Sequence, residues 1–191
     1  MESIDIYELF NKACIDGSYN VINELLKSNN DYMQHKDTRG NYPIFNLLNN
    51  NDIFYGEFGN KIDFELFKKL INLINNIDQI NSDGETILEM ILSSCLPRNE
   101  MYIKFLMEKG ALLENCKNIK EILTHLVICN NYGSGIFKED MPTSFWYNLI
   151  IQMLSLANEK FILDNNYLHQ LIGFAKRNKD EKMENIIKFY I

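Results

Sequence analysis

Three histidines and a scatter of carboxylates are the side chains of this sequence that could carry out acid–base chemistry. His35, His125 and His169 lack the short spacing of a metal site or a catalytic pair. Carboxylates gather in two stretches rich in turn residues, as Glu57, Asp63 and Glu65 and as Glu139 and Asp140. Paired carboxylates act as acid and base only where a cleft separates their pKa values, and charged loop residues are usually solvated. We therefore expect no catalytic residues.

Motifs for nucleotides, nucleophiles and metals are missing from the sequence. No Gly-x-x-x-x-Gly-Lys-Ser/Thr, Gly-x-Ser-x-Gly or His-Glu-x-x-His pattern occurs. The four cysteines, Cys14, Cys95, Cys116 and Cys129, are spaced too irregularly for a zinc site and are too few for a disulfide framework. This pattern favours buried thiols in a reducing compartment. The sequence thus predicts a protein that is not an enzyme and has no cofactor or metal site.

The composition narrows the choice of partner. The chain has 191 residues, a formal charge of −7 and a hydrophobic fraction of 46%, which favours a folded protein. An acidic balance argues against binding to nucleic acid or to an anionic membrane. No stretch approaches the roughly 18–20 apolar residues of a membrane helix, and the first five residues are acidic. We expect a cytoplasmic protein, in its own cell or in a host, and its 26 asparagines indicate an AT-rich genome such as that of an amoeba, a large virus or an intracellular bacterium.

The elements that must position any functional residues begin with a repeated pattern of turn and short helix. It occurs in Asp37–Phe45 and again in Ser82–Glu89. In each, an Asp-containing turn with a glycine precedes an apolar stripe with i, i+3, i+4 spacing. Pro43 and Thr86 suit the start of a helix. The stripes are Ile44, Leu47 and Leu48 in one, and Leu88, Ile91 and Leu92 in the other.

Longer amphipathic helices alternate with these short ones. They are predicted at Asn20–Lys27, Phe67–Ile74 and Tyr102–Ala111. The last contains Lys109-Gly110, which places a cation in the final turn and a glycine at the C-cap. Leu106 is expected in the core between adjacent helix pairs.

At this point the sequence resembles the ankyrin-repeat family, whose repeat of about 33 residues is a β-turn and two helices with a Thr-Pro-Leu-His-x-Ala signature. Tyr42–Phe45 keeps the proline, Thr86–Glu89 keeps the threonine and leucine, and Tyr167–His169 keeps the leucine and histidine. Phe10–Gly17 keeps the alanine and the glycine. The resemblance implies an all-α solenoid of about five helix-turn-helix repeats. It also implies that His169 stabilises a turn by hydrogen bonding.

The resemblance covers nearly the whole chain as a single domain, 1–191. The expected repeats are 5–36, 37–80, 81–115, 116–162 and 163–191. Two of them are about ten residues longer than the family period. The extra residues fall in 49–63 and 130–143, which we interpret as loops inserted between the two helices of a repeat. These loops carry Phe54, Tyr55 and Phe58, and Tyr132, Ile136, Phe137 and Met141. They either cover their own repeat or form a binding edge.

Ankyrin proteins commonly bind a partner across the turn tips and the first helices. Carried over by position, the partner-binding residues are Thr38, Arg39, Asn41, Asn49, Ser82, Asp83, Glu85 and Ser93. The alternative for each is a solvated turn residue. The predicted function is a non-catalytic protein–protein interaction scaffold in a cytosol, with a host-directed factor from a virus or intracellular microbe as one form of it. The alternatives are an enzyme or small-ligand binder that uses a site near the inserted loops, and an assembly subunit of a virus particle.

The C-terminal helix offers a second candidate surface. Phe189 and Ile191 lie off the stripe formed by Met183, Ile186, Ile187 and Tyr190, although a terminal repeat should be polar outside. This predicts contact with a partner or a second copy through Phe189 and Ile191. Fraying of the last residues is the competing interpretation.

Overall fold

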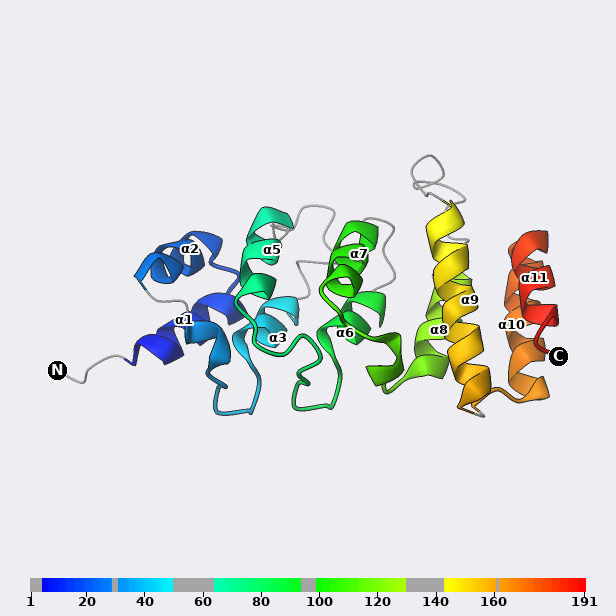
Figure 1. The fold of residues 1–191 in the computed structure, drawn as a ribbon, viewed down its shortest axis with the longest axis horizontal. Coiled ribbons are helices and arrows are strands. Elements are labelled where there is room, and N and C mark those ends of the chain that lie inside the picture. Colours follow the sequence, from blue (N-terminus) through cyan, green and yellow to red (C-terminus); the bar gives the residue numbers. More distant parts are fainter. Residues whose placement is uncertain (1–4, 29–30, 50–63, 94–98, 130–142, 161) are drawn as a thin grey trace. The chain divides into compact units, whose positions relative to one another are not determined.

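The computed structural model describes residues 5–28, 31–49, 64–93, 99–129, 143–160 and 162–191 (Figure 1). These residues form ten α-helices and two short 3-10 helices, and they contain no strand. A single isolated β-bridge within them joins Ile80 and Thr86. The all-α prediction is confirmed.

The α-helices are α1 (Ile6–Ile15), α2 (Tyr19–Ser28), α3 (Pro43–Leu48), α5 (Phe64–Asn72), α6 (Ile87–Ser93), α7 (Glu100–Glu108), α8 (Ile119–Cys129), α9 (Thr143–Glu159), α10 (Asn165–Arg177) and α11 (Glu181–Lys188). The 3-10 helices are η1 (Asp31–Gln34) and η3 (Leu113–Asn115). No helix in the described ranges is both long and apolar enough to cross a membrane.

The chain divides into two compact units, of which the first comprises Met1–Ser94 and Tyr102–Asn115. In this unit α1 packs against α2 and α3, and α3 packs against α6. Aromatic side chains join α5 to α7. Phe67 contacts the ring of Tyr102 edge-on at a centroid distance of 4.9 Å, and Phe64 contacts Phe105 at 5.9 Å. Helices α1, α3 and α6 therefore form one row, and α5 and α7 lie side by side.

The second unit comprises Cys95–Met101 and Cys116–Ile191. In it α8 packs against α9 and α10, and α11 packs against α10 and α9. Tyr147 of α9 donates its hydroxyl to the Asp180 carboxylate at 3.0 Å, and Asp180 also caps α11 by accepting from the Met183 N–H at 2.9 Å. This unit is thus a pair of helix hairpins joined by side chains between their second helices.

Helix boundaries follow the local signals of the sequence. Pro43 occupies the first turn of α3, and the Thr86 hydroxyl accepts from the Glu89 N–H at 3.1 Å at the start of α6. Gly110 follows α7 with a φ of 93°, and the Ala111 N–H donates to the Leu106 carbonyl at 3.0 Å. These three predictions are confirmed, because caps and proline act within one turn of the chain.

The core is made of the predicted apolar stripes. Leu106 is 0% exposed. The stripe residues Ile44, Leu47, Leu48, Leu88, Ile91 and Leu92 are all buried. Cys14 and Cys116 are buried and form no disulfide, and burial raises the pKa of the Cys14 thiol.

Several predictions fall outside the described residues. They include most of both inserted loops and the aromatic residues placed in them, together with Glu57, Asp63, Glu139, Asp140 and Cys95. At the loop ends, Asn49 is described and exposed, and Thr143 belongs to α9 and not to a loop.

Candidate functional site

The first polar turn, Asp37–Asn41, is closed by its own leading side chain. The Asp37 N–H donates to the Asn41 carbonyl at 2.8 Å, and the Gly40 N–H donates to the Asp37 carbonyl at 3.0 Å. Asp37 Oδ1 accepts from the N–H groups of Arg39 and Asn41, both at 2.9 Å. Gly40 has a φ of 85°, a conformation that glycine adopts without steric strain. We call this turn the first finger.

A second finger, Asn81–Glu85, has the same construction. Asn81 Oδ1 accepts from the N–H groups of Asp83 at 2.9 Å and Glu85 at 2.8 Å. The Asn81 N–H donates to the Glu85 carbonyl at 3.0 Å, and Gly84 has a φ of 83°. An Asp and an Asn thus fill the same position in two turns, because each offers a side-chain oxygen that accepts from backbone N–H groups two and four residues further on.

Asn41 joins the two fingers. Its Oδ1 accepts from the Ser82 N–H at 2.8 Å, and the residue is only 5% exposed. We expected Asn41 to face a partner, and its burial withdraws it from the contact surface. It fixes the spacing of the fingers instead.

A polar network lies beneath the first finger. Asp37 Oδ2 accepts from Arg39 Nε at 3.2 Å and from Asn46 Nδ2 at 3.0 Å. Arg39 Nη2 donates to Asn46 Oδ1 at 3.1 Å, and Asn46 Nδ2 also donates to Asn11 Oδ1 at 3.2 Å. The network holds the exposed Arg39 guanidinium in one orientation, which lowers the conformational entropy lost when a partner binds it.

Asp37 is held in its ionised form. Burial raises the pKa of its carboxyl, but hydrogen bonds from Asn41, Asn46 and Arg39 outweigh burial and leave the pKa below its ordinary value. A carboxylate of this kind stabilises structure and is a poor proton donor at neutral pH.

The remaining predicted contact residues differ in exposure. Thr38, Ser82 and Asp83 are exposed at the tips of the fingers. Glu85 is half-buried and accepts from Asn81 Nδ2 at 3.0 Å. Asn49 is exposed after α3, and Ser93 is half-buried at the end of α6. The finger tips are therefore the accessible part of the predicted site.

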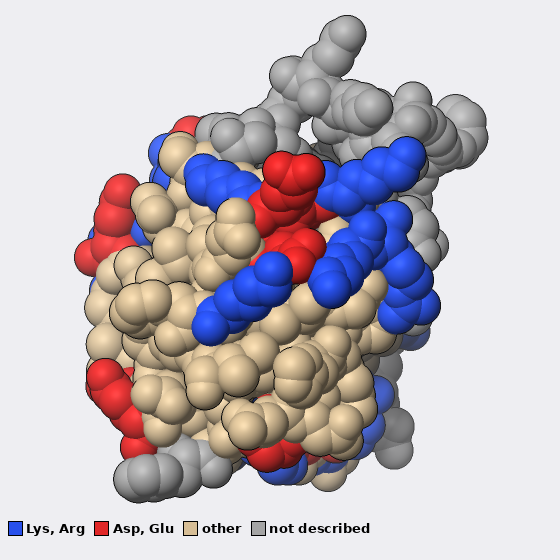
Figure 2. All heavy atoms as spheres, turned by 90° about the vertical axis from the view of Figure 1, so that its right-hand side faces the viewer, with Lys and Arg blue, Asp and Glu red and all other residues tan. Residues whose placement is uncertain are grey.

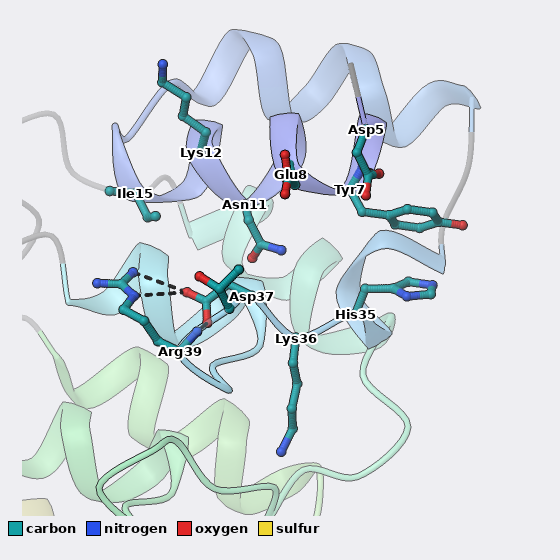
Figure 3. A pocket seen from close by; sticks show the side chains of 11 residues that line it. Asp5, Tyr7, Glu8, Asn11, Lys12, Ile15, His35, Lys36, Asp37 and Arg39 are labelled. Carbon is teal, nitrogen blue, oxygen red and sulfur yellow. Dashed lines mark hydrogen bonds and ion pairs between the residues drawn. The ribbon is translucent and has the colours of Figure 1, made fainter. Parts of the chain in front are cut away.

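A hollow of about 440 Å³ opens beside the first finger. Its walls are the segment from His35 to Arg39 and one face of α1 (Figure 3). The face of α1 contributes Asp5, Tyr7, Glu8, Asn11, Lys12 and Ile15. The sequence analysis identified Thr38 and Arg39 but missed this wall. The spacing of Asp5, Glu8, Lys12 and Ile15 along one helix face was the signal that could have found it.

The three histidines have different surroundings. The ring of His35 lies 3.9 Å from that of Tyr7, centroid to centroid, and His125 is half-buried on α8. The prediction for His169 was wrong. It is exposed on α10 and makes no hydrogen bond with any described residue. The start of that helix is capped by Asp164, which accepts from the Tyr167 N–H at 2.8 Å. In the described ranges no three His, Cys, Asp or Glu side chains are arranged to hold a metal ion.

The face formed by α10 and α11 carries charges toward one end and mostly uncharged residues elsewhere (Figure 2). Lys176 and Lys188 both pair with Glu184, whose pKa is lowered chiefly by its hydrogen bond with Lys188. Phe189 is 85% exposed and Ile191 is 53% exposed. Met183 and Ile187 are buried, as their stripe predicted. Self-association through Phe189 and Ile191 stays a prediction.

No family model, curated protein or solved structure matches this chain. The geometry of the chain itself therefore defines its structural class. The described residues form an all-α protein with helix rows in one unit, helix hairpins in the other, and two linked polar fingers in the first.

Proposed function

We propose that this protein is a non-catalytic scaffold of ankyrin-like repeats that binds a partner protein through its fingers. The observation that supports this most is the likeness of the two fingers, each closed by an Asp or Asn side chain and a glycine with positive φ. The Asn41–Ser82 hydrogen bond fixes one finger relative to the next. Such an array presents a rigid row of exposed tips.

The order of the helices supports the repeat part of the proposal. In the first unit each finger leads directly into a short helix, α3 or α6, and these helices pack against each other. A longer helix follows each short one in the sequence, and α5 and α7 contact each other through their aromatic rings. Repetition of one turn–helix–helix unit with contact between like elements is the construction of a solenoid.

The polar groups at the fingers favour recognition over catalysis. Asp37, Asn81 and Asn41 are occupied with backbone N–H groups, and Arg39 is held by Asp37 and Asn46. Groups bound in this way set the shape of a surface. Hydrogen-bond donors and charges at the exposed tips are then available to orient a partner, and pre-organised side chains are the ones that contribute most to binding.

The proposal includes action in a cytosol, either of its own cell or of a host. Irregular cysteine spacing supports it, as do the buried Cys14 and Cys116, which form no disulfide, because structural disulfides are rare in reducing compartments.

The test is affinity purification from cells, followed by binding measurements on the purified partner with three forms of the full chain. The double variant Ser82→Glu with Asp83→Lys changes two exposed residues at the tip of the second finger, neither of which lines the hollow beside the first finger. Asn72→Lys, on the exposed side of α5, is the matched control. We expect the finger variant to bind at least about tenfold more weakly, which corresponds to loss of about 1.4 kcal/mol. Both variants should melt like the wild type.

A finger variant that binds normally would reject the fingers as the contact surface. If no variant of the fingers or of α5 affects binding but deletion of Phe54–Asn60 abolishes it, the inserted loop is the recognition element instead.

A further inference from the structure

We infer that the hollow beside the first finger binds an extended peptide segment of the partner in which a basic and an acidic side chain are two residues apart. This inference rests on the proposed function and names the chemistry of what is bound. It comes from three properties of the hollow: the order of charges along α1, an unpaired amide in its floor and its neutral balance of charge.

The charges along the α1 wall are ordered. Asp5 and Glu8 lie toward the start of the helix, and Lys12 and Ile15 lie toward its end, where Arg39 faces the hollow (Figure 3). The α1 wall is therefore acidic at one end and basic at the other, whereas on the finger side Arg39 is paired with Asp37. A bound segment with opposite charges in the complementary order would pair at both ends.

Two of these charges are available for a ligand. Glu8 and Lys12 are exposed, and neither makes an ion pair or side-chain hydrogen bond with any described residue. Asp5 accepts one hydrogen bond, from the Tyr7 N–H at 2.9 Å. Arg39 is oriented by Asp37 and Asn46 but remains exposed. The ends of the hollow can thus form ion pairs without breaking existing ones.

Asn11 supplies an unpaired donor in the floor. The residue is 6% exposed, and its Oδ1 accepts from Asn46 Nδ2 at 3.2 Å. Its Nδ2 has no partner among the described residues, and Figure 3 shows this nitrogen turned away from Asp37, toward the middle of the hollow. This nitrogen is open to the hollow, and a peptide carbonyl oxygen could accept a hydrogen bond from it.

Helix and strand dimensions set the spacing. Glu8 and Lys12 are four residues apart on a helix, which is about 6 Å at a rise of 1.5 Å per residue. In an extended peptide, side chains two residues apart project to the same face and lie about 6.6 Å apart. The two separations agree, so one basic and one acidic side chain at positions i and i+2 would meet Glu8 and Lys12. The carbonyl between them would lie over Asn11.

The charge balance distinguishes a peptide from a phosphate-bearing ligand. The hollow is lined by three carboxylates, Asp5, Glu8 and Asp37, and by three cations, Lys12, Lys36 and Arg39. Its formal charge is 3 − 3 = 0. A phosphate group brings about two negative charges, which the carboxylates would repel. A segment that carries one charge of each sign has no such penalty.

The experiment uses the full chain and fluorescent eight-residue peptides with one central triplet in a Gly-Ser background, measured by fluorescence anisotropy at low salt. The triplets are Lys-Ala-Glu, Lys-Ala-Lys, Glu-Ala-Glu and Lys-Ala-phosphoserine. We expect Lys-Ala-Glu to bind at least about fivefold more tightly than each of the others. Lys-Ala-Lys and Glu-Ala-Glu each replace an attraction by a repulsion, and the phosphoserine peptide brings a second negative charge next to the carboxylates that line the hollow.

Charge-reversed variants of the protein give the more stringent test. Glu8→Lys should prefer Glu-Ala-Glu, and Lys12→Glu should prefer Lys-Ala-Lys. The control changes Glu24→Lys and Lys27→Glu together, an exposed pair on α2 outside the hollow, and should keep the wild-type order. Asn11→Ala should weaken every peptide by a similar factor. Its melting temperature is recorded to separate lost binding from lost folding, because Asn11 also contacts Asn46.

The inference is overturned if the four peptides bind alike, if the phosphoserine peptide binds most tightly, or if the charge-reversed proteins keep the wild-type preference. The proposed function is tested separately by the finger variants and the purified partner. If the partner binds through the finger tips and Glu8→Lys has no effect on that binding, the proposed function stands and the peptide-binding role of the hollow is rejected.

Discussion

Asp37 and Asn81 occupy the same position in two fingers but differ in charge. Both side chains accept two backbone N–H groups. Only Asp37 also accepts from Arg39 Nε and Asn46 Nδ2, and these donors stabilise its ionised form. The first finger should therefore lose stability in acid through Asp37.

The pH dependence of stability tests this difference. The pKa of Asp37 is lowered in the folded protein from an ordinary value of 3.8, so its contribution to stability is present above that value and is lost as the pH falls through the folded pKa. Asp37→Asn should be less stable than the wild type at pH 6, measured by urea unfolding. The gap should narrow as the pH falls below about 4 and through the lowered pKa of the folded state. Asp16→Asn, at an exposed carboxylate after α1, is the control and should show no such gap. A gap for Asp37→Asn that stays constant with pH would contradict the assignment.

Lys179 is the described non-glycine residue with a left-handed backbone, at a φ of 56°. It lies between α10 and α11, where the Asp180 N–H donates to the Ala175 carbonyl at 3.0 Å. Gly17 has the same conformation between α1 and α2, with a φ of 64° and a matching bond from the Ser18 N–H to the Ala13 carbonyl at 2.9 Å. The two turns have the same backbone geometry. Only the turn between α1 and α2 has a glycine at the left-handed position, where glycine avoids steric strain.

Replacing Lys179 by glycine should therefore stabilise the protein by roughly 1 kcal/mol, the lower end of the strain assigned to a left-handed residue. This stabilisation can be measured by thermal unfolding, with circular dichroism as the signal. Lys179→Ala removes the same side chain but keeps the steric strain, so it should leave the melting temperature nearly unchanged. Equal effects of the two substitutions would mean that charge and not backbone strain is responsible.

At the scale of elements, aromatic and leucine side chains join the longer helices. Phe64 and Phe67 of α5 contact Tyr102 and Phe105 of α7, and the fully buried Leu106 lies in the same helix. Each helix is short, and isolated helices below about 12 residues are marginal in water. Packing between helices must supply most of the stability.

Leu106→Ala should lower the free energy of unfolding by about 2–5 kcal/mol, the range for a buried leucine. The control is Leu112→Ala, six residues along the chain at a position 45% exposed, where about 0.5 kcal/mol or less is expected. Chemical denaturation of both variants gives the comparison. A small change for Leu106→Ala would show that α7 packs through another face.

At the scale of the whole molecule, charge is distributed unevenly along the chain. The net charge is −7, yet α10, α11 and the turn between them contain five cations, Lys176, Arg177, Lys179, Lys182 and Lys188, against three carboxylates, Asp180, Glu181 and Glu184. The same segment ends in the exposed Phe189 and Ile191. A cationic segment with exposed apolar residues is a candidate contact surface on an acidic protein.

Self-association through this end predicts a mass that rises with protein concentration. Light scattering after size exclusion should detect it, and Phe189→Ser should reduce it while leaving the melting temperature nearly unchanged, because the side chain is exposed. Asn185→Ser, at another exposed position of α11, is the control. A wild-type protein that remains a monomer at all concentrations would contradict the prediction.

The sequence by itself determined the helical class and many helix boundaries. Pro43, Thr86 and Gly110 act on the backbone within one turn, and the 3.6-residue period identified Leu106 and the stripes of α3 and α6 as core. The exposure of Phe189 and Ile191 followed from the same period. Each of these properties depends on residues close together in the chain, so local spacing was sufficient to predict it.

Only the tertiary structure decided what the polar residues do. Asn41 was expected to face a partner, but it bonds Ser82, 41 residues away, and Asn46 bonds Asn11, 35 residues away. The hollow needs α1 and the first finger together, and neither segment alone indicates it. His169 has the place of a signature residue but is exposed, and Asp164 caps α10. A polar side chain has several partners of similar energy, and the packing of distant segments selects among them.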